Sequence, residues 1–133
     1  MERTLVLIKP DAIERKHMGE IISIYERDFY ISDMKIIKTS VEIAEKHYYE
    51  HRDKPFFNEL IAYITRGNVC ALIVEGNNAI ERVRKINGAT DPRKAEEGSI
   101  RRKFALSKQE NSVHGSDSKE NAEREINIWF GKK

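Results

Sequence analysis

Hydrophobic residues are spaced along the chain in patterns that predict alternating strands and helices. Residues 3–8 (RTLVLI) predict a buried strand, which must end at Pro10 because proline has no backbone N–H to donate. Residues 69–74 (VCALIV) are all apolar and predict the strongest strand, buried on both faces. A looser alternation over residues 30–39 predicts a third strand, and a short extended piece is expected before the last helix.

Helical spacing of apolar side chains predicts five helices between and after these strands. They cover residues 18–29, 40–50, 57–67, 78–88 and 118–131. Thr39 or Ser40 can cap the second helix, Thr39 with Glu42 matches a capping box, and Asn78 can cap the fourth helix. This order of elements indicates an α+β domain, in its simplest form one antiparallel sheet with helices on one side. A parallel α/β sheet is the competing architecture.

The composition is that of a charge-coated protein of ordinary domain size. The chain has 133 residues, 39% hydrophobic and 35% charged, so we expect a single domain over residues 1–133. The longest apolar run is far shorter than the ~20 residues that a membrane helix needs, and the N-terminal run is too short for a secretory signal. Cys70 is the only cysteine, which excludes an internal disulfide. We therefore expect a cytoplasmic protein with no membrane partner.

Basic residues concentrate in one segment. Residues 82–108 carry nine Lys and Arg and three Asp and Glu, whereas the rest of the chain carries 15 and 19. Most of this segment lies in a stretch of little periodicity, 88–110, and loops of that length are usually functional. A basic loop on a mildly acidic body indicates one anionic ligand site rather than a nucleic-acid surface. A solvated basic face is the alternative.

The histidines offer the most specific candidate chemistry. Glycine-rich phosphate-binding motifs are absent, so side-chain cations would have to hold the phosphates of a bound nucleotide. His47 and His51 have a spacing that can bind zinc, but without a third ligand we expect surface histidines of a helix. His114 follows the basic loop, in residues 111–118 (NSVHGSDS). It is either a turn histidine or a phosphoryl acceptor beside an anion-binding loop.

The chain resembles the nucleoside diphosphate kinase family over essentially its whole length. The most specific match is the N-x-x-H-G-S-D-S pattern of residues 111–118. The other matches follow in family order: 8–11 (IKPD), 19–22 (GEII), 47–48 (HY), 55–57 (PFF), 87–92 (NGATDP), 98–101 (GSIR), 122–126 (AEREI) and 129–130 (WF). The resemblance implies a ferredoxin-like α+β fold with a βαββαβ core, helices on the faces of its antiparallel sheet and a long basic loop.

The resemblance also implies an enzyme. It would move the γ-phosphoryl group of a nucleoside triphosphate to a nucleoside diphosphate by ping-pong transfer through a phosphohistidine. By resemblance, His114 carries the group on Nδ1 and Glu125 orients the ring. The other catalytic residues that the resemblance implies are Lys9, Tyr48 and Ser116. The implied nucleotide-binding residues are Lys9, Phe56, Arg84, Thr90, Arg101 and Asn111, with Phe56 stacking on the base.

The resemblance further implies a metal cofactor and an assembly. Mg²⁺ would bridge the phosphates with few protein ligands, so no metal-ligating residue is assigned. Family members form hexamers or tetramers built from dimers, and we expect one of these homo-oligomers. Residues 108–110 (KQE) depart from the family, where many members have a small or apolar residue and a glycine. This departure falls on the far side of the expected base pocket.

Two other functions remain compatible with parts of the sequence. A non-catalytic nucleotide- or nucleic-acid-binding regulator would use the basic segment, and its DNA binding would weaken steeply with salt. A histidine phosphocarrier would take phosphate from a protein partner and would not need Phe56, Arg84 and Arg101 arranged for a nucleotide. Indifference to loss of His114 would favour the regulator, and indifference to loss of Phe56 would favour the phosphocarrier.

Overall fold

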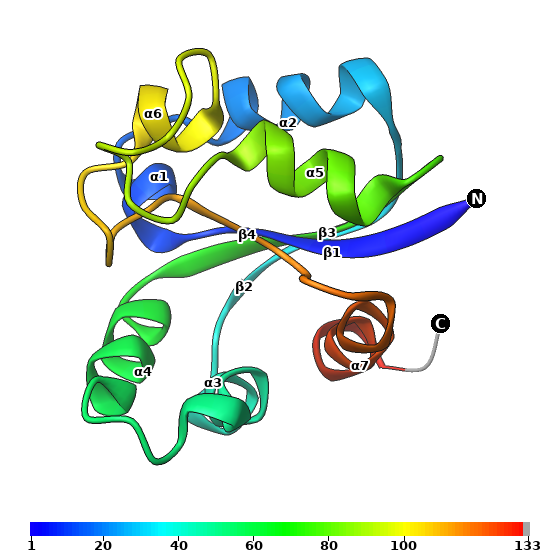
Figure 1. Ribbon diagram of the computed structural model, residues 1–133. Coiled ribbons are helices and arrows are strands. Elements are labelled where there is room, and N and C mark those ends of the chain that lie inside the picture. The colour runs from blue at the N-terminus through cyan, green and yellow to red at the C-terminus, as the bar shows by residue number, and fades with distance from the viewer. Residues whose placement is uncertain (132–133) are drawn as a thin grey trace.

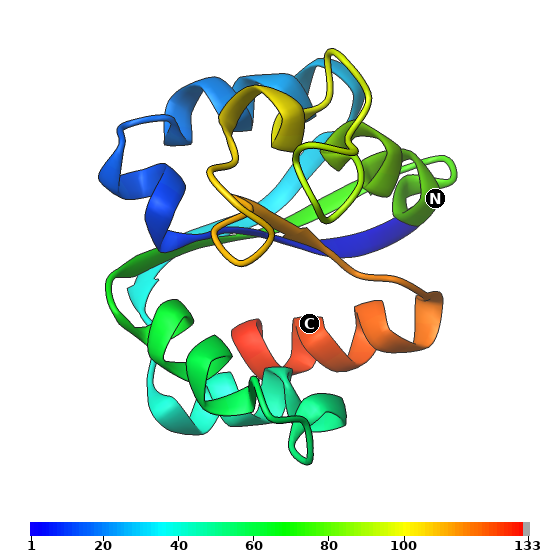
Figure 2. The ribbon, with the colours of Figure 1, turned by 60° about the vertical axis from the view of Figure 1, so that its left-hand side comes forward.

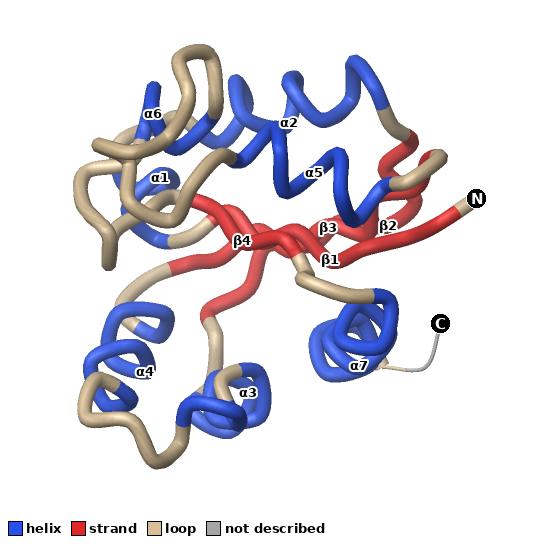
Figure 3. Tube along the Cα trace, in the orientation of Figure 1, coloured by secondary structure: helices blue, strands red, loops and turns tan. Residues whose placement is uncertain are grey.

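Four antiparallel strands form one sheet at the centre of the molecule. The structure is a computed structural model and describes residues 1–131. The strands are β1 (Glu2–Ile8), β2 (Tyr30–Lys38), β3 (Asn68–Gly76) and β4 (Val113–Gly115). Their spatial order is β2-β3-β1-β4. Figure 3 draws the four strands in red between the helices. Helices link β1 to β2 and β3 to β4, so the predicted α+β fold with a βαββαβ core is confirmed, and the parallel alternative is wrong.

Helices cover both faces of this sheet (Figure 1, Figure 2). One face carries α2 (Met18–Asp28), α5 (Ala79–Asn87) and α6 (Ile100–Phe104). The opposite face carries α3 (Val41–His47), α4 (Phe57–Thr65) and α7 (Lys119–Phe130). A short α1 (Pro10–Glu14) follows β1, and a 3₁₀ turn, η1 (Tyr49–His51), follows α3. Within residues 1–131, no helix combines the length and apolar character needed to cross a membrane.

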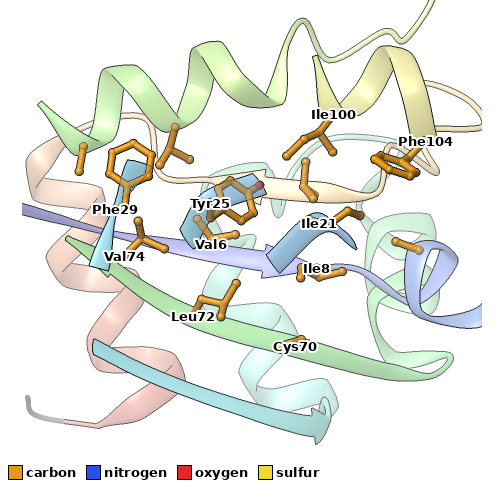
Figure 4. Packing of buried hydrophobic residues seen from close by; sticks show 14 residues of the cluster. Val6, Ile8, Ile21, Tyr25, Phe29, Cys70, Leu72, Val74, Ile100 and Phe104 are labelled. Carbon is orange, nitrogen blue, oxygen red and sulfur yellow. The ribbon is translucent and has the colours of Figure 1, made fainter. Parts of the chain in front are cut away.

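The pattern-based expectation of helices on one side of the sheet is wrong, for a reason visible in the central strands. Along β1, Val6 and Ile8 point into one apolar cluster, whereas Leu5 and Leu7 point into a second cluster on the other face. β3 divides its side chains in the same way. Figure 4 shows the first cluster, where Val6 and Ile8 of β1 lie with Tyr25 and Ile21 of α2. Strands that are apolar on both faces need a helical layer on each.

Several local predictions need correction. Ser40, not Thr39, caps α3, since its hydroxyl accepts from the Ile43 N–H at 3.1 Å. Asn78 adopts a left-handed conformation and makes no side-chain cap to α5. The stretch 88–110 is not wholly irregular because it contains α6, which Ser99 caps. The other predicted strands and helices are present, with boundaries that differ by a few residues.

Candidate active site

His114 lies on β4, where the register of the sheet fixes its backbone. It pairs with Leu7 of β1, next to the end of that strand. Its Nε2 is 2.8 Å from Oε1 of Glu125 on α7, and the Ser116 hydroxyl donates to the same oxygen at 2.6 Å. Because a carboxylate only accepts hydrogen bonds, Nε2 carries the proton, and the lone pair of a neutral ring lies on Nδ1.

A glycine allows α5 to approach this strand. A Cβ on Gly115 would lie 3.0 Å from both Asn87 Nδ2 and Val83 Cγ1, which is tighter than nearly all real contacts. Close packing at this point brings the C-terminal half of α5, with Arg84, beside His114. Both residues line a cleft of about 740 Å³.

Six of the residues predicted from the sequence line this cleft, which we call the active-site cleft: Tyr48, Arg84, Thr90, Arg101, His114 and Glu125. Lys9, Phe56, Asn111 and Ser116 do not line it directly. Three buried polar atoms of the lining have no hydrogen-bond partner: Nδ1 of His51 and, among the predicted residues, the Tyr48 hydroxyl and Nε of Arg101. Unpaired buried donors are costly, so the last two atoms are candidates to bind a ligand.

The cationic residues of the cleft differ in how they are held. Arg101 donates to the carbonyl oxygens of Gly88, at 2.8 Å, and Val113, at 2.7 Å, which fix its guanidinium between the basic loop and β4. Burial, together with nearby Arg84, lowers the pKa of Arg101. Arg84 and Thr90 are exposed. A half-buried, anchored cation beside an exposed one forms a positive floor that attracts phosphate.

Lys9 and Asn111, which do not line the cleft directly, are hydrogen-bonded to each other. Lys9 directly follows β1 and is only 7% exposed. Its ammonium donates to Oδ1 of Asn111 at 2.9 Å. Burial, assisted by Arg101, lowers the pKa of Lys9 to about 7. Its charged form is therefore disfavoured until a negative partner arrives.

Comparison with known proteins agrees with this arrangement. The family model described as nucleoside diphosphate kinase matches residues 2–133. A Clostridium perfringens protein named nucleoside diphosphate kinase is 58% identical over 133 residues, covering 99% of this chain and 93% of the relative. One from Pyrococcus abyssi is 59% identical, covering 97% and 84%. The chain belongs to the nucleoside diphosphate kinase family.

Solved structures give the same result for the fold. The apo nucleoside diphosphate kinase of Encephalitozoon cuniculi aligns with a TM-score of 0.97 at 39% identity, covering 99% of this chain and 90% of that one. The Aquifex aeolicus enzyme aligns with a TM-score of 0.93 at 42% identity, covering 97% and 94%. The predicted family and activity are confirmed. The chain is a nucleotide phosphotransferase that depends on a divalent metal, and the catalytic interpretation prevails over the regulator.

In this kinase the two adjacent phenylalanines, of which the resemblance assigns base stacking to Phe56, have different surroundings. Phe56 is 40% exposed, whereas Phe57 packs against the apolar cluster beneath the sheet. The Phe56 ring is 5.8 Å from that of His51, which lines the cleft. Phe56 is therefore the one available to a planar ligand.

The prediction that His47 lies on the surface is wrong. His47 is only 5% exposed, and its Nδ1 accepts a hydrogen bond from Nε1 of Trp129 at 3.1 Å. Its ring lies 4.6 Å from that of His114, at 77°. Nothing in the neighbouring sequence signals this burial, because Trp129 is 82 positions away along the chain.

Sequence reasoning also missed Asp11 as a support of the site. Its buried carboxylate accepts hydrogen bonds from the hydroxyls of Tyr63 and Ser112, the latter at 2.8 Å, and pairs with Arg15. Ser112 adjoins Asn111 and has a left-handed backbone. Asp11 thereby ties the end of β1 to the segment before His114. The available signal is the I-K-P-D match itself, in which the resemblance assigns a role only to Lys9.

One group of potential metal ligands stands out among residues 1–131. Donor atoms of His47, His114 and Glu125 all lie within 4.8 Å of one another. However, the Nδ1 lone pair of His47 is bonded to Trp129, and Glu125 already binds His114 and Ser116. Because these hydrogen bonds already occupy the donor atoms, the three residues do not fit a resident metal ion, and we assign none to them. A divalent metal that arrives on the nucleotide phosphates needs few protein ligands.

Proposed function

We propose that this kinase works by ping-pong transfer through a phosphohistidine at Nδ1 of His114. The observation that carries the proposal is the contact of Nε2 with the buried carboxylate of Glu125, which Ser116 also binds. This contact leaves the nucleophilic lone pair on Nδ1, facing away from Glu125. Nucleotides then bind in turn to one site, first to donate the γ-phosphoryl group and then to receive it.

The remaining site residues receive roles by their chemistry. Arg84, Thr90 and Arg101 bind the phosphates, and guanidinium groups suit this task because their N–H donors match phosphate oxygens. Tyr48 donates to the transferred group, a role supported by its unpaired hydroxyl at the cleft. Lys9 and Asn111, already bonded to each other, contact the phosphates and a ribose hydroxyl.

Phe56 binds the base by stacking. Its exposure supports this role, because a ring that served only the core would be covered. Stacking contributes ~1–3 kcal/mol and tolerates every base. The 108–110 segment borders this region, since Gln109 donates to the Glu59 carboxylate at 2.8 Å and Glu110 pairs with Arg66.

The metal in this proposal is Mg²⁺, bound chiefly by phosphate oxygens and water. Mg²⁺ retains much of its hydration and is usually held by one or two carboxylates together with substrate phosphates. It offsets the phosphate charge during transfer. The cleft lining offers more carboxylates than such a metal needs: Glu50, Glu96, Asp117 and Glu125. Among them, Glu125 is already bonded to His114 and Ser116.

We further propose a homo-oligomer, a hexamer or tetramer built from dimers, in which each subunit is one domain over residues 1–133. The exposed apolar side chains of Tyr30, Met34 and Ile36 on edge strand β2 support contact between subunits. A cytoplasmic location fits the single, unpaired thiol of Cys70.

The proposal is tested by His114→Ala. Incubation with γ-labelled ATP and Mg²⁺ should label the unaltered protein in an acid-labile, base-stable form, and His114→Ala should lose both the label and GTP formation from ATP and GDP. His17→Ala is the control, because His17 packs on Phe104 outside the cleft lining. Retained turnover in His114→Ala would contradict the proposal.

A further inference from the structure

His47 is the buried titratable group of the site that the proposed mechanism leaves unused. It ends α3 and lies between two rings, Trp129 on α7 and His114 on β4. The bond from Nε1 of Trp129 fixes its tautomer: since Nδ1 accepts that hydrogen bond, the proton of a neutral His47 lies on Nε2.

The surroundings of His47 oppose its protonation. A proton on Nδ1 would face the indole N–H, so two donors would meet and the bond to Trp129 would be lost. Burial holds the pKa of His47 well below its usual value, and the neighbouring basic groups His114, Lys9, Arg124 and His51 lower it further. Glu125 is the acidic group of this cluster, and its Oε1 is already bonded to His114 and Ser116.

The His47 ring lies against the His114 ring. Their centroids are 4.6 Å apart and their planes are inclined by 77°, which is an edge-to-face contact. Glu125 holds the His114 ring by a hydrogen bond at Nε2 alone. Because the ring is otherwise attached only through Cβ, it can still rotate about the line between these two points. The His47 ring packed against the His114 ring restricts this rotation.

We propose that His47 is a positioning residue for phosphoryl transfer, whose neutral ring, oriented by Trp129, keeps Nδ1 of His114 aligned with the bound phosphate. This inference rests on the proposed role of His114 and adds His47 and Trp129 to it. Small misplacements of a nucleophile reduce rates by up to about a hundredfold, so loss of this contact should act on kcat.

Two substitutions separate the ring of His47 from its hydrogen bond. His47→Asn keeps an acceptor, because Oδ1 of asparagine is as many bonds from Cα as Nδ1 of histidine, but it loses the ring. His47→Phe keeps a ring against His114 and leaves the Trp129 N–H without a partner. We expect kcat to fall at least tenfold in His47→Asn, with the KM values for ATP and GDP within about twofold, and to fall less than threefold in His47→Phe.

A purely structural role predicts the opposite order, because the buried, unpaired indole makes His47→Phe the less stable variant. Thermal unfolding of both variants, followed by circular dichroism, sets an assay temperature at which each is folded. Unchanged kcat in His47→Asn, or an equal loss in both variants, would overturn the inference.

A measurement on the unaltered enzyme keeps the inference testable even if neither variant folds. Nitrogen-15 NMR of the imidazoles should show His47 as the neutral Nε2–H tautomer, without titration, from pH 6 to 8.5. Titration of His47 in that range, or a proton on Nδ1, would overturn it. Labelling separates the two proposals. Absence of phosphate on His114 contradicts the proposed function, whereas a phosphorylated His114 with no effect of His47→Asn contradicts only the role of His47.

Discussion

The two walls of the active-site cleft are prepared to different degrees. On the α7 wall, His114 is hydrogen-bonded to Glu125, and His47 and Trp129 pack behind it, all without a ligand. On the opposite wall, which we call the loop wall, Arg84 at the C-terminal half of α5 and Thr90 in the basic loop are exposed. The nucleophile His114 is therefore oriented before the substrate binds, whereas Arg84 and Thr90 reach their phosphate contacts only when the substrate is bound.

This difference separates the expected effects of mutation. Preorganised groups stabilise the transition state without reorganisation during the reaction, so damage to the α7 wall should lower kcat. Groups that meet the substrate from solvent contribute mainly to its binding, so damage to the loop wall should raise KM.

The largest effect is expected from Glu125→Gln. The amide cannot offer a charged acceptor to both His114 and Ser116, so orientation of the ring is lost, and kcat should fall about a hundredfold with KM nearly unchanged. Steady-state kinetics with ATP and GDP measures this. Glu123→Gln on the same helix is the control, because Glu123 is exposed and pairs with Arg3. A raised KM with unaltered kcat would remove the distinction between the walls.

A smaller effect is expected from Arg84→Ala. Loss of one charge-assisted hydrogen bond to phosphate should raise the KM for ATP about twentyfold, with a lesser change in kcat. Arg82→Ala, two residues earlier, is the matched control because its guanidinium binds the Asn77 carbonyl outside the cleft lining. Equal effects of the two substitutions would show that Arg84 acts only through general charge.

The neighbouring phenylalanines should separate binding from stability. Phe56→Ala should raise the KM for every nucleotide about tenfold and leave thermal stability nearly unchanged. Phe57→Ala should lower the free energy of unfolding by about 2 kcal/mol, because its partly buried ring packs against the core, with little effect on KM. Denaturant unfolding and steady-state kinetics on both variants test this. An unstable Phe56→Ala with normal KM would reverse the assignment.

The smallest effect concerns a proton on Lys9. Its pKa of about 7 is raised when phosphates approach, so nucleotide binding at pH 8 should take up as much as one proton. In the free protein, the unfolded chain binds more protons at Lys9 than the folded one between pH 7 and 10.5, so this residue makes stability rise with pH in that window. Calorimetry in two buffers of different ionisation enthalpy measures the uptake, which Lys9→Met should abolish. If Lys9→Met still took up a proton on nucleotide binding, a group other than Lys9 would bind that proton.

Local pattern predicted most of the fold, and its failures have local causes. The two central strands were predictable because their apolar runs are unbroken, but the same feature implied helices on both faces of the sheet. The short helix α6 carries only Ile100 and Phe104 as buried residues among basic ones, too few to stand out as a periodic stripe. Its signal was Ser99, a cap followed by apolar residues four apart.

The sequence predicted those residues of the site that belong to the family motifs. Spacing alone could not join His114 to Glu125, which meet only when α7 folds back along β1 and β4; the family resemblance supplied that pair. His47 shows the limit: with Glu45 and Lys46 before it, it resembles a surface residue, and its burial depends on contacts with distant segments. Pattern cannot reveal a burial that tertiary contacts alone create.

The most direct test is the chemical identity of the phosphorylated intermediate. The unaltered enzyme is incubated with ATP and Mg²⁺, and the phosphohistidine is assigned by phosphorus-31 and nitrogen-15 NMR. Because Glu125 holds Nε2 of His114, the account predicts phosphate on Nδ1 of His114 alone. Phosphate on Nε2, or on any other residue, would contradict it.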